Sequence, residues 1–155
     1  MIDMGLVKRY KDPKSGKHVT EKPVKFLTGT ARYASMNSHM IEQSRRDDLE
    51  AIGITMIYFL KGSLPWMGIK DIADDQKNSA IYQLKVDTSP KELCEGCPNE
   101  FLTYLEYCRS LKFDSKPNYT YLRSLMKDAV IKSGEKVDCY TDWLMKKMGK
   151  EIPIS

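Results

Sequence analysis

The sequence has few residues of the kinds that most often bind zinc or form disulfides: four cysteines and two histidines among 155 residues. Cys94 and Cys97 have the C-x-x-C spacing of a zinc ligand pair, but a zinc site needs two further ligands. The remaining candidates, Cys108, Cys139, His18 and His39, have no second paired spacing. We therefore expect buried or half-buried reduced thiols, as in a cytoplasmic or nuclear protein, and no zinc site.

Long apolar runs are also missing. The densest one, Ile52 to Leu60, is about half of the roughly 18 residues that a membrane span needs. The N-terminus lacks a charged region followed by an apolar stretch and a cleavage site, so we expect neither secretion nor a membrane partner. Hydrophobic residues make up 41% of the chain and charged residues 30%, values typical of one folded globular domain.

The charge is unevenly distributed. Between Lys8 and Lys25 there are seven basic and two acidic residues, a local charge of +5, whereas the whole chain carries +4. From Lys8 to Thr30 the sequence has no apolar periodicity and contains several prolines and glycines, which predicts a long loop. The charge alone is compatible with a solvated lysine-rich loop, the simpler interpretation, or with a surface that meets an anionic partner.

From Ser44 onward the pattern becomes helical. Ser44 and Asp47 have the spacing of a capping box, and Gly62 is a plausible terminator. The residues from Ile52 to Leu60 are apolar all round, so we expect this central helix to be buried on every side. The further helices expected are Ile69 to about Lys85, one opened by Ser89-Pro90 and ended at Gly96, one opened by Pro98, Tyr121 to Lys132, and a last one around Trp143 that stops at Gly149. The sequence thus predicts a mainly α fold with about five or six helices and little or no sheet.

Several motifs occur together along the chain. They are Asp3-Met4-Gly5, Gly29-Thr30-Ala31-Arg32-Tyr33-Ala34-Ser35, Glu42-Gln43-Ser44-Arg45-Arg46-Asp47-Asp48-Leu49-Glu50 and Gly62-Ser63-Leu64-Pro65-Trp66. In order and spacing this set resembles the C-terminal part of casein kinase 1, a family of serine/threonine protein kinases. The resemblance runs from Asp3 to about Trp143. It implies a partial kinase domain over residues 1–149, with an activation segment at 3–37 and a helical lobe at 38–149, and a short tail at 150–155.

The resemblance also implies roles for individual residues. Asp3 and Gly5 match the Asp-Phe-Gly motif, whose aspartate holds Mg²⁺ across the phosphates of ATP, with Met4 in place of the phenylalanine. Thr30 matches the threonine that contacts the catalytic loop. Asp48 matches a structural carboxylate at the start of the central helix.

A family anion pocket falls on Arg32, Gly68 and Lys77, and a second basic cluster on Lys8 and Lys25. The resemblance therefore implies acidic or phosphorylated protein substrates, and it makes anion binding the preferred interpretation of the basic loop. The adjacent Arg45 and Arg46 are expected to form a structural ion-pair network.

The parts of a kinase that bind and transfer phosphate are missing from these 155 residues. There is no Gly-x-Gly-x-x-Gly loop, no lysine on a strand before Asp3 and no His-Arg-Asp catalytic loop. We therefore expect no productive binding of ATP and Mg²⁺ and no activity of the chain by itself. The alternative is a non-catalytic module that binds phosphorylated or acidic segments or pairs with a complementary N-terminal kinase lobe. Nucleic-acid binding is disfavoured, since Tyr10 is the only aromatic residue in the Lys8-to-Lys25 segment.

Overall fold

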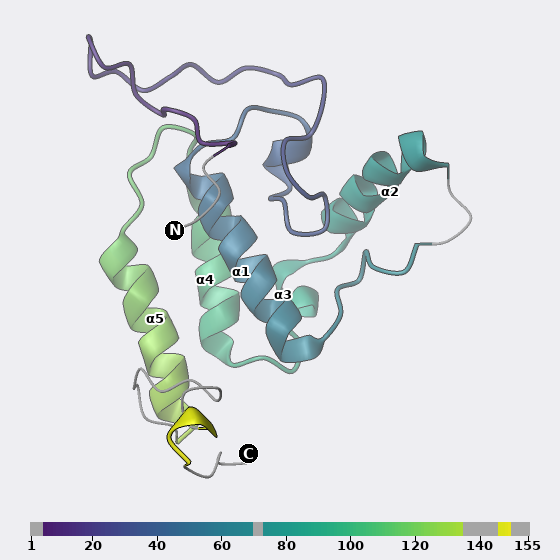
Figure 1. The fold of residues 1–155 in the computed structure, drawn as a ribbon, viewed down its shortest axis with the longest axis vertical. Coiled ribbons are helices and arrows are strands. Elements are labelled where there is room, and N and C mark those ends of the chain that lie inside the picture. The colour runs from purple at the N-terminus through teal and green to yellow at the C-terminus, as the bar shows by residue number, and fades with distance from the viewer. Residues whose placement is uncertain (1–4, 70–72, 135–145, 150–155) are drawn as a thin grey trace.

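The structure is a computed structural model that describes residues 5–69, 73–134 and 146–149, and these residues are mainly helical (Figure 1). The helices are α1 (Arg45–Lys61), α2 (Asp74–Asp87), α3 (Pro90–Leu93), α4 (Asn99–Ser110) and α5 (Tyr119–Lys132), preceded by a short 3-10 helix, η1 (Asn37–His39). Over the same residues no strand forms, and sheet pairing is limited to two isolated antiparallel bridges, Lys11 with His18 and Pro23 with Ile41. The predicted mainly α fold is confirmed.

Helix α1 begins and ends where local chemistry predicts. The backbone N–H of Ser44 donates to the Asp47 carboxylate at 2.8 Å, which satisfies a donor at the helix start. At the other end Gly62 has a φ of 72°, in the left-handed region that glycine adopts most easily, and its N–H donates to the Tyr58 carbonyl at 2.8 Å. Both boundaries follow from residues within one turn of the helix.

The later helices differ from the predictions by a few residues. The Ser89 hydroxyl accepts the Glu92 N–H at 3.1 Å and starts α3 as expected, but this helix already ends at Leu93. The Asn118 side chain accepts the Tyr121 N–H at 3.0 Å, so α5 begins at Tyr119. Helix α2 begins at Asp74, five residues after the predicted start. For the helix predicted around Trp143, both Trp143 and Leu144 lie outside the described residues.

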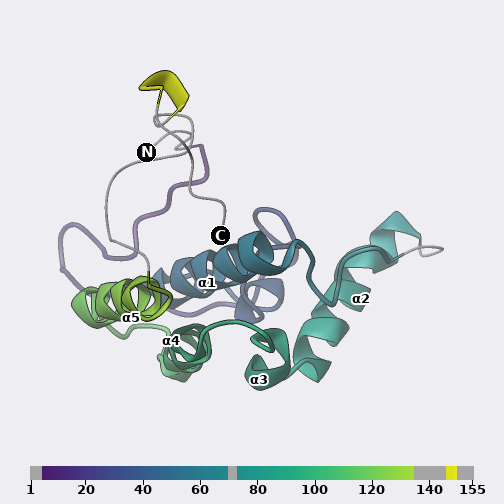
Figure 2. The ribbon, with the colours of Figure 1, turned by 90° about the horizontal axis from the view of Figure 1, so that it is seen from below.

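The core lies between the helices that follow η1. Helix α1 packs against α4, which in turn contacts α5 and α3 (Figures 1 and 2). The main cluster of buried apolar side chains consists of Ile54, Ile57, Leu64, Trp66, Ile81, Leu93, Cys94, Phe101, Leu105 and Ala129, and a second cluster of Tyr104, Cys108 and Leu122. Each large side chain of this kind contributes about 1.5–3 kcal/mol on burial, so the α1–α4–α5 contacts account for much of the stability.

The prediction that α1 is buried on every side is wrong. Ile52, Phe59 and Leu60 are 51%, 76% and 56% exposed. In Figure 2, α3 and α4 lie on one side of α1, and this side holds the buried Ile54 and Ile57. Ile52 and Phe59 are two helical turns apart and therefore share the opposite face. The helix thus carries an apolar stripe (Ile52, Phe59 and Leu60) on the molecular surface.

The segment before η1 is the long loop that the sequence predicts. It runs out and back as the purple trace in Figure 1, with a turn at Gly16. Asp12 N–H donates to the Lys17 carbonyl and Val19 N–H to the Tyr10 carbonyl, both at 2.9 Å. The basic side chains from Lys8 to Lys25 are exposed. This loop therefore places its positive charge in solvent.

Candidate functional site

Four of the predicted site residues line one surface cavity. Thr30, Arg32, Gly68 and Lys77 surround a space of about 370 Å³. They come from the loop before η1, the loop after α1 and the first part of α2, and their cavity is completed by Ala31, Trp66, Met67, Ile69, Asn78 and Ile81. Folding brings together residues that are far apart in the sequence. We call this space the Arg32 cavity.

The Arg32 cavity is cationic. The side chains of Arg32 and Lys77 are exposed, and neither forms an ion pair with a carboxylate whose side chain the structure describes. The Arg32 guanidinium lies 5.8 Å from the centre of the Tyr33 ring, and hydrogen bonding with Tyr33 raises its pKa. Gly68, which lines the same cavity, has a φ of 77°, a backbone conformation that other residues rarely adopt. Among the described side chains, no carboxylate therefore competes with an anion for either cation.

The backbone beneath the Arg32 cavity is fixed by two buried side chains. Trp66 Nε1 donates to the Arg32 carbonyl at 2.7 Å, and Trp66 is buried. The ammonium of Lys85 donates to the carbonyls of Ala31, at 2.7 Å, and of Ala34. Lys85 also lies 5.0 Å from the centre of the Trp66 ring, in a cation–π arrangement. The segment that carries Arg32 is thus held from the protein interior.

Lys85, which supports the backbone of the cavity, is not among the residues that the sequence predicts for the site. It is only 1% exposed, although lysines are almost never fully buried unless they are paired. The available signal was its position four residues after Ile81, on the face of α2 that faces the core. An apolar periodicity that contains a lysine does not reveal whether that lysine is buried.

Burial changes the protonation of Lys85 and of its neighbour His39. Burial lowers the pKa of Lys85 to about 8, while the charge of Glu50 opposes this shift and that of Arg109 adds to it. His39 Nε2 lies 3.4 Å from Lys85 Nζ. Burial and the charge of Lys85 lower the pKa of His39 to about 4. At neutral pH the pair is therefore a mostly charged lysine beside a neutral imidazole, which can offer an unprotonated nitrogen to the ammonium.

The second basic cluster, predicted at Lys8 and Lys25, is not gathered in one cavity. Lys8 lines a space of about 340 Å³, together with Glu42, Arg45 and Asp48 among others, and its Nζ lies 3.6 Å from Glu42. Lys25 is exposed and does not line that space. The charge of Lys8 is thus partly compensated by a carboxylate.

The residues predicted to hold the nucleotide are described only in part. Asp3 lies outside the described residues, and Gly5 is exposed at the start of the described chain. Where side chains are described, no three of the His, Cys, Asp and Glu residues are placed to hold a metal ion. The carboxyl of Asp48 lines the cavity beside Lys8, and its partial burial and the neighbouring Asp47 raise its pKa.

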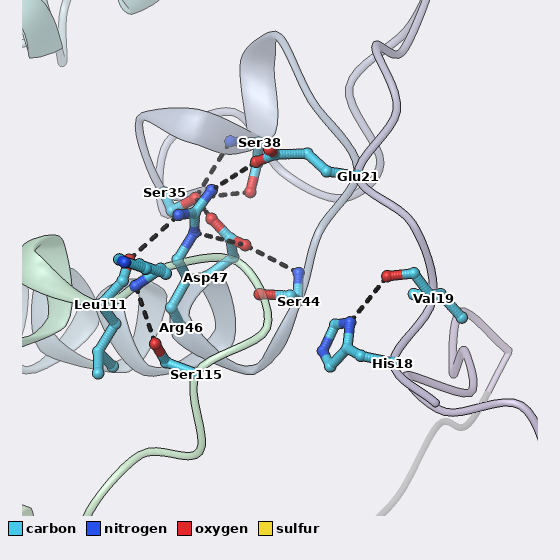
Figure 3. Close-up of polar contacts among 11 residues, drawn as sticks. His18, Val19, Glu21, Ser35, Ser38, Ser44, Arg46, Asp47, Leu111 and Ser115 are labelled. Carbon is cyan, nitrogen blue, oxygen red and sulfur yellow. Dashed lines mark hydrogen bonds and ion pairs between the residues drawn. The ribbon is translucent and has the colours of Figure 1, made fainter. Parts of the chain in front are cut away.

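Arg46 and Asp47 form a structural network at the start of α1 (Figure 3). The buried Asp47 carboxylate accepts the Ser35 hydroxyl at 2.6 Å, in addition to the Ser44 amide. The Arg46 guanidinium lies 3.2 Å from the Glu21 carboxylate and donates to the Leu111 carbonyl at 3.1 Å. It therefore joins the basic loop, α1 and the segment after α4.

Arg45 also has a structural role, but it forms no ion pair with a described carboxylate, unlike the ion-pair network that the sequence predicts. Its guanidinium donates to the Asp114 carbonyl at 2.8 Å and lies 4.4 Å from the centre of the Tyr10 ring. A cation placed over an aromatic ring in this way contributes about 0.5–2 kcal/mol, depending on its exposure. Arg45 thereby fixes the basic loop to the segment after α4.

The described cysteines are free thiols. Cys94 and Cys108 are buried, and burial raises their pKa values to about 11 and about 12. They are therefore protonated at neutral pH and poor nucleophiles. The helices in the described part of the chain are all too short or too polar to cross a membrane.

The fold and the site define a mainly helical protein with a cationic surface cavity. No family model matches the chain. The ligand of the Arg32 cavity is therefore argued from the chemistry of the residues that line it.

Proposed function

We propose that the Arg32 cavity binds the phosphate or carboxylate of an acidic or phosphorylated protein segment. The observation that carries this proposal is that Arg32 and Lys77 line one cavity, and neither is neutralised by a described carboxylate. A guanidinium can donate two parallel hydrogen bonds to an anion, while an ammonium adds a point charge. A phosphoserine, with about −1.5 to −2 charges and three acceptor oxygens, suits this pair better than a carboxylate does.

The resemblance to casein kinase 1 supports a wider proposal. The chain would be the C-terminal part of a serine/threonine protein kinase that uses ATP and Mg²⁺, and the Arg32 cavity would receive substrates that are acidic or already phosphorylated. The free thiols of Cys94, Cys97 and Cys108 fit a cytoplasmic or nuclear location.

The residues present do not make a nucleotide site. The sequence holds no Gly-x-Gly-x-x-Gly loop and no His-Arg-Asp loop, and Asp3 alone is too little to hold Mg²⁺ and ATP. We therefore expect no phosphoryl transfer by a polypeptide of these 155 residues. Incubation of the purified chain with labelled ATP and an acidic peptide tests this. Transfer that disappears in Asp3→Ala would contradict our expectation.

The binding proposal is tested by titrating a fluorescent phosphoserine peptide and its unphosphorylated counterpart. We expect the phosphopeptide to bind more tightly, and Arg32→Ala to weaken it by about tenfold, as for the loss of a charge-assisted hydrogen bond. Lys127→Ala is the matched control, since Lys127 is exposed on α5 and outside the cavity. Affinity should also fall with added salt. Equal affinity for both peptides, or no effect of Arg32→Ala, would overturn the proposal.

A second candidate function is pairing with a complementary polypeptide such as an N-terminal kinase lobe. The exposed stripe on α1 favours it, because Phe59 is 76% exposed next to the exposed Leu60. Co-purification of the chain with an N-terminal lobe of casein kinase 1 type tests this pairing. Phe59→Ser should weaken the complex, whereas Lys91→Ser, an exposed change on α3, should not. Failure of the wild-type chain to form any complex would eliminate this candidate.

A further inference from the structure

We infer that Lys85 is a positioning residue for the Arg32 cavity: its buried ammonium fixes the backbone turn from which Arg32 reaches the anion. The inference rests on the proposed binding function and adds to it a residue that the bound anion does not touch. Lys85 is 1% exposed, so it acts through the backbone and through its charge.

The geometry of the turn supports this role. Lys85 Nζ donates to the carbonyls of Ala31 and Ala34, which lie on either side of Arg32 along the chain. Trp66 Nε1 donates to the carbonyl of Arg32 itself, at 2.7 Å. Three of the four carbonyls from residue 31 to residue 34 are thus held by only two side chains. Within the turn, the amides of Tyr33 and Ala34 donate to the Thr30 carbonyl at 3.1 and 3.2 Å.

The surroundings of Lys85 explain why a lysine is needed there. An ammonium has three donors, and the two carbonyls together with His39 Nε2, at 3.4 Å, supply three acceptors. An apolar side chain at this position would leave the carbonyls of Ala31 and Ala34 without these donors. Unmade hydrogen bonds to buried groups are costly, so the turn would rearrange toward water.

The charge of Lys85 adds a second effect. The ammonium forms no ion pair with any described carboxylate, and its neighbours are the neutral His39 on η1 and the Trp66 ring. From the adjoining helices, Glu50 on α1 and Arg109 on α4 act on it with opposite signs. Its positive charge therefore contributes to the potential beneath the cavity. Low-dielectric surroundings screen such a charge less than water does.

The experiment compares Lys85→Met with Lys61→Met. Lys61 is the matched control, because its ammonium also donates to a backbone carbonyl, that of Leu93 at 3.1 Å, but lies outside the cavity. Two quantities are measured: the affinity for the phosphoserine peptide, and the hydrogen exchange rates of individual amides. We expect Lys85→Met to weaken phosphopeptide binding about tenfold and to speed exchange at Tyr33 and Ala34 by at least as much. Lys61→Met should change neither.

The exchange measurement separates positioning from general destabilisation. A merely structural role would raise exchange throughout α1 and α4, whereas positioning raises it in the turn alone. If Lys85→Met does not fold, Trp66→Phe replaces it, because this change removes the donor to Arg32 and keeps an aromatic ring. It should produce the same loss of affinity and the same local exchange.

The outcomes distinguish the two proposals. If the wild-type chain binds the peptide and Arg32→Ala weakens this binding, while Lys85→Met binds as well as wild type, the inference about Lys85 is wrong and the proposed function stands. If Lys85→Met speeds amide exchange in the turn but leaves the phosphopeptide affinity unchanged, the inference about Lys85 is also wrong and the proposed function again stands. If the wild-type chain does not bind the phosphopeptide, both proposals are overturned.

Discussion

Arg109 Nε lies 3.0 Å from Glu50 Oε1, and this ion pair joins α4 to α1 in the interior of the protein. The Glu50 side chain is 3% exposed and that of Arg109 is 18% exposed. The charge of Glu50 also opposes the lowering of the Lys85 pKa. The Glu50 carboxylate thus pairs with one cation, Arg109, and favours the charged form of a second, Lys85.

The first prediction concerns this carboxylate. Glu50→Gln should lower the free energy of unfolding by about 2–4 kcal/mol, because it leaves Arg109 largely buried without its charged partner. Urea unfolding measures this loss. The control is Glu106→Gln, since Glu106 is exposed on the same helix as Arg109 and should change stability by less than about 0.5 kcal/mol. Equal stabilities of the two variants would show that the buried pair contributes nothing.

The second prediction concerns Gly53, where α1 approaches α4 closely. A Cβ atom built at this position would lie 2.9 Å from Leu105 Cδ2 and 2.9 Å from Tyr104 Cε1. Gly53→Ala should therefore destabilise the protein by about 1–3 kcal/mol, although alanine favours helices more than glycine does. Thermal unfolding of this variant is compared with that of Ile52→Ala, a change at the neighbouring exposed position. A more stable Gly53→Ala would mean that α4 can move aside without cost.

The third prediction uses two serine–aspartate hydrogen bonds that differ in burial. Ser35 donates to the buried Asp47 at 2.6 Å, and Ser15 donates to the exposed Asp12 at 2.9 Å. Ser35→Ala should cost about 1–3 kcal/mol, because a buried carboxylate loses a partner, whereas Ser15→Ala should cost less than about 0.5 kcal/mol. Chemical denaturation of both variants provides the comparison. Similar losses would imply that water replaces the Ser35 hydroxyl.

The fourth prediction is a pH dependence caused by His39. Its pKa is about 4 in the folded protein, below its ordinary value of 6.5, so the unfolded chain binds more protons between these two pH values. The contribution of this neutral imidazole is complete above pH 6.5 and is lost as the pH falls toward 4. The stability of wild type relative to His39→Gln should therefore drop by about 1–2 kcal/mol between pH 7 and pH 4, allowing for the half-buried position of the ring. A constant difference across this range would show that His39 is not buried as a neutral ring.

Local sequence signals predict the helices well, because helix ends are decided within one turn. Ser44, Asp47 and Gly62 fix α1, and Ser89 starts α3, through contacts that short motifs specify. The exposure of Phe59 could not be predicted in the same way. A run of apolar residues shows that a helix can be covered on all sides, but not whether the rest of the chain reaches every side.

The candidate site was predicted only in part, for a related reason. Arg32, Gly68 and Lys77 were proposed from motifs that resemble a kinase family, and periodicity alone would not have joined them. Lys85 was missed because its environment consists of backbone carbonyls from a distant segment. Carbonyl groups carry no sequence signature, so a buried lysine that binds them looks like any other lysine before the fold is known.

The exposed loop from Lys8 to Lys25 should be more susceptible to trypsin than the helices are. Its lysines lie in solvent outside any helix, whereas many of the later basic residues lie within helices. Brief digestion should therefore cut this loop early, and among the later described residues the exposed Lys112, between α4 and α5, is a comparable site, as mass spectrometry would show. Arg46 pairs with Glu21, and the His18 ring packs at 5.1 Å against Phe113. A nicked peptide should accordingly stay attached to the helices until a denaturant releases it.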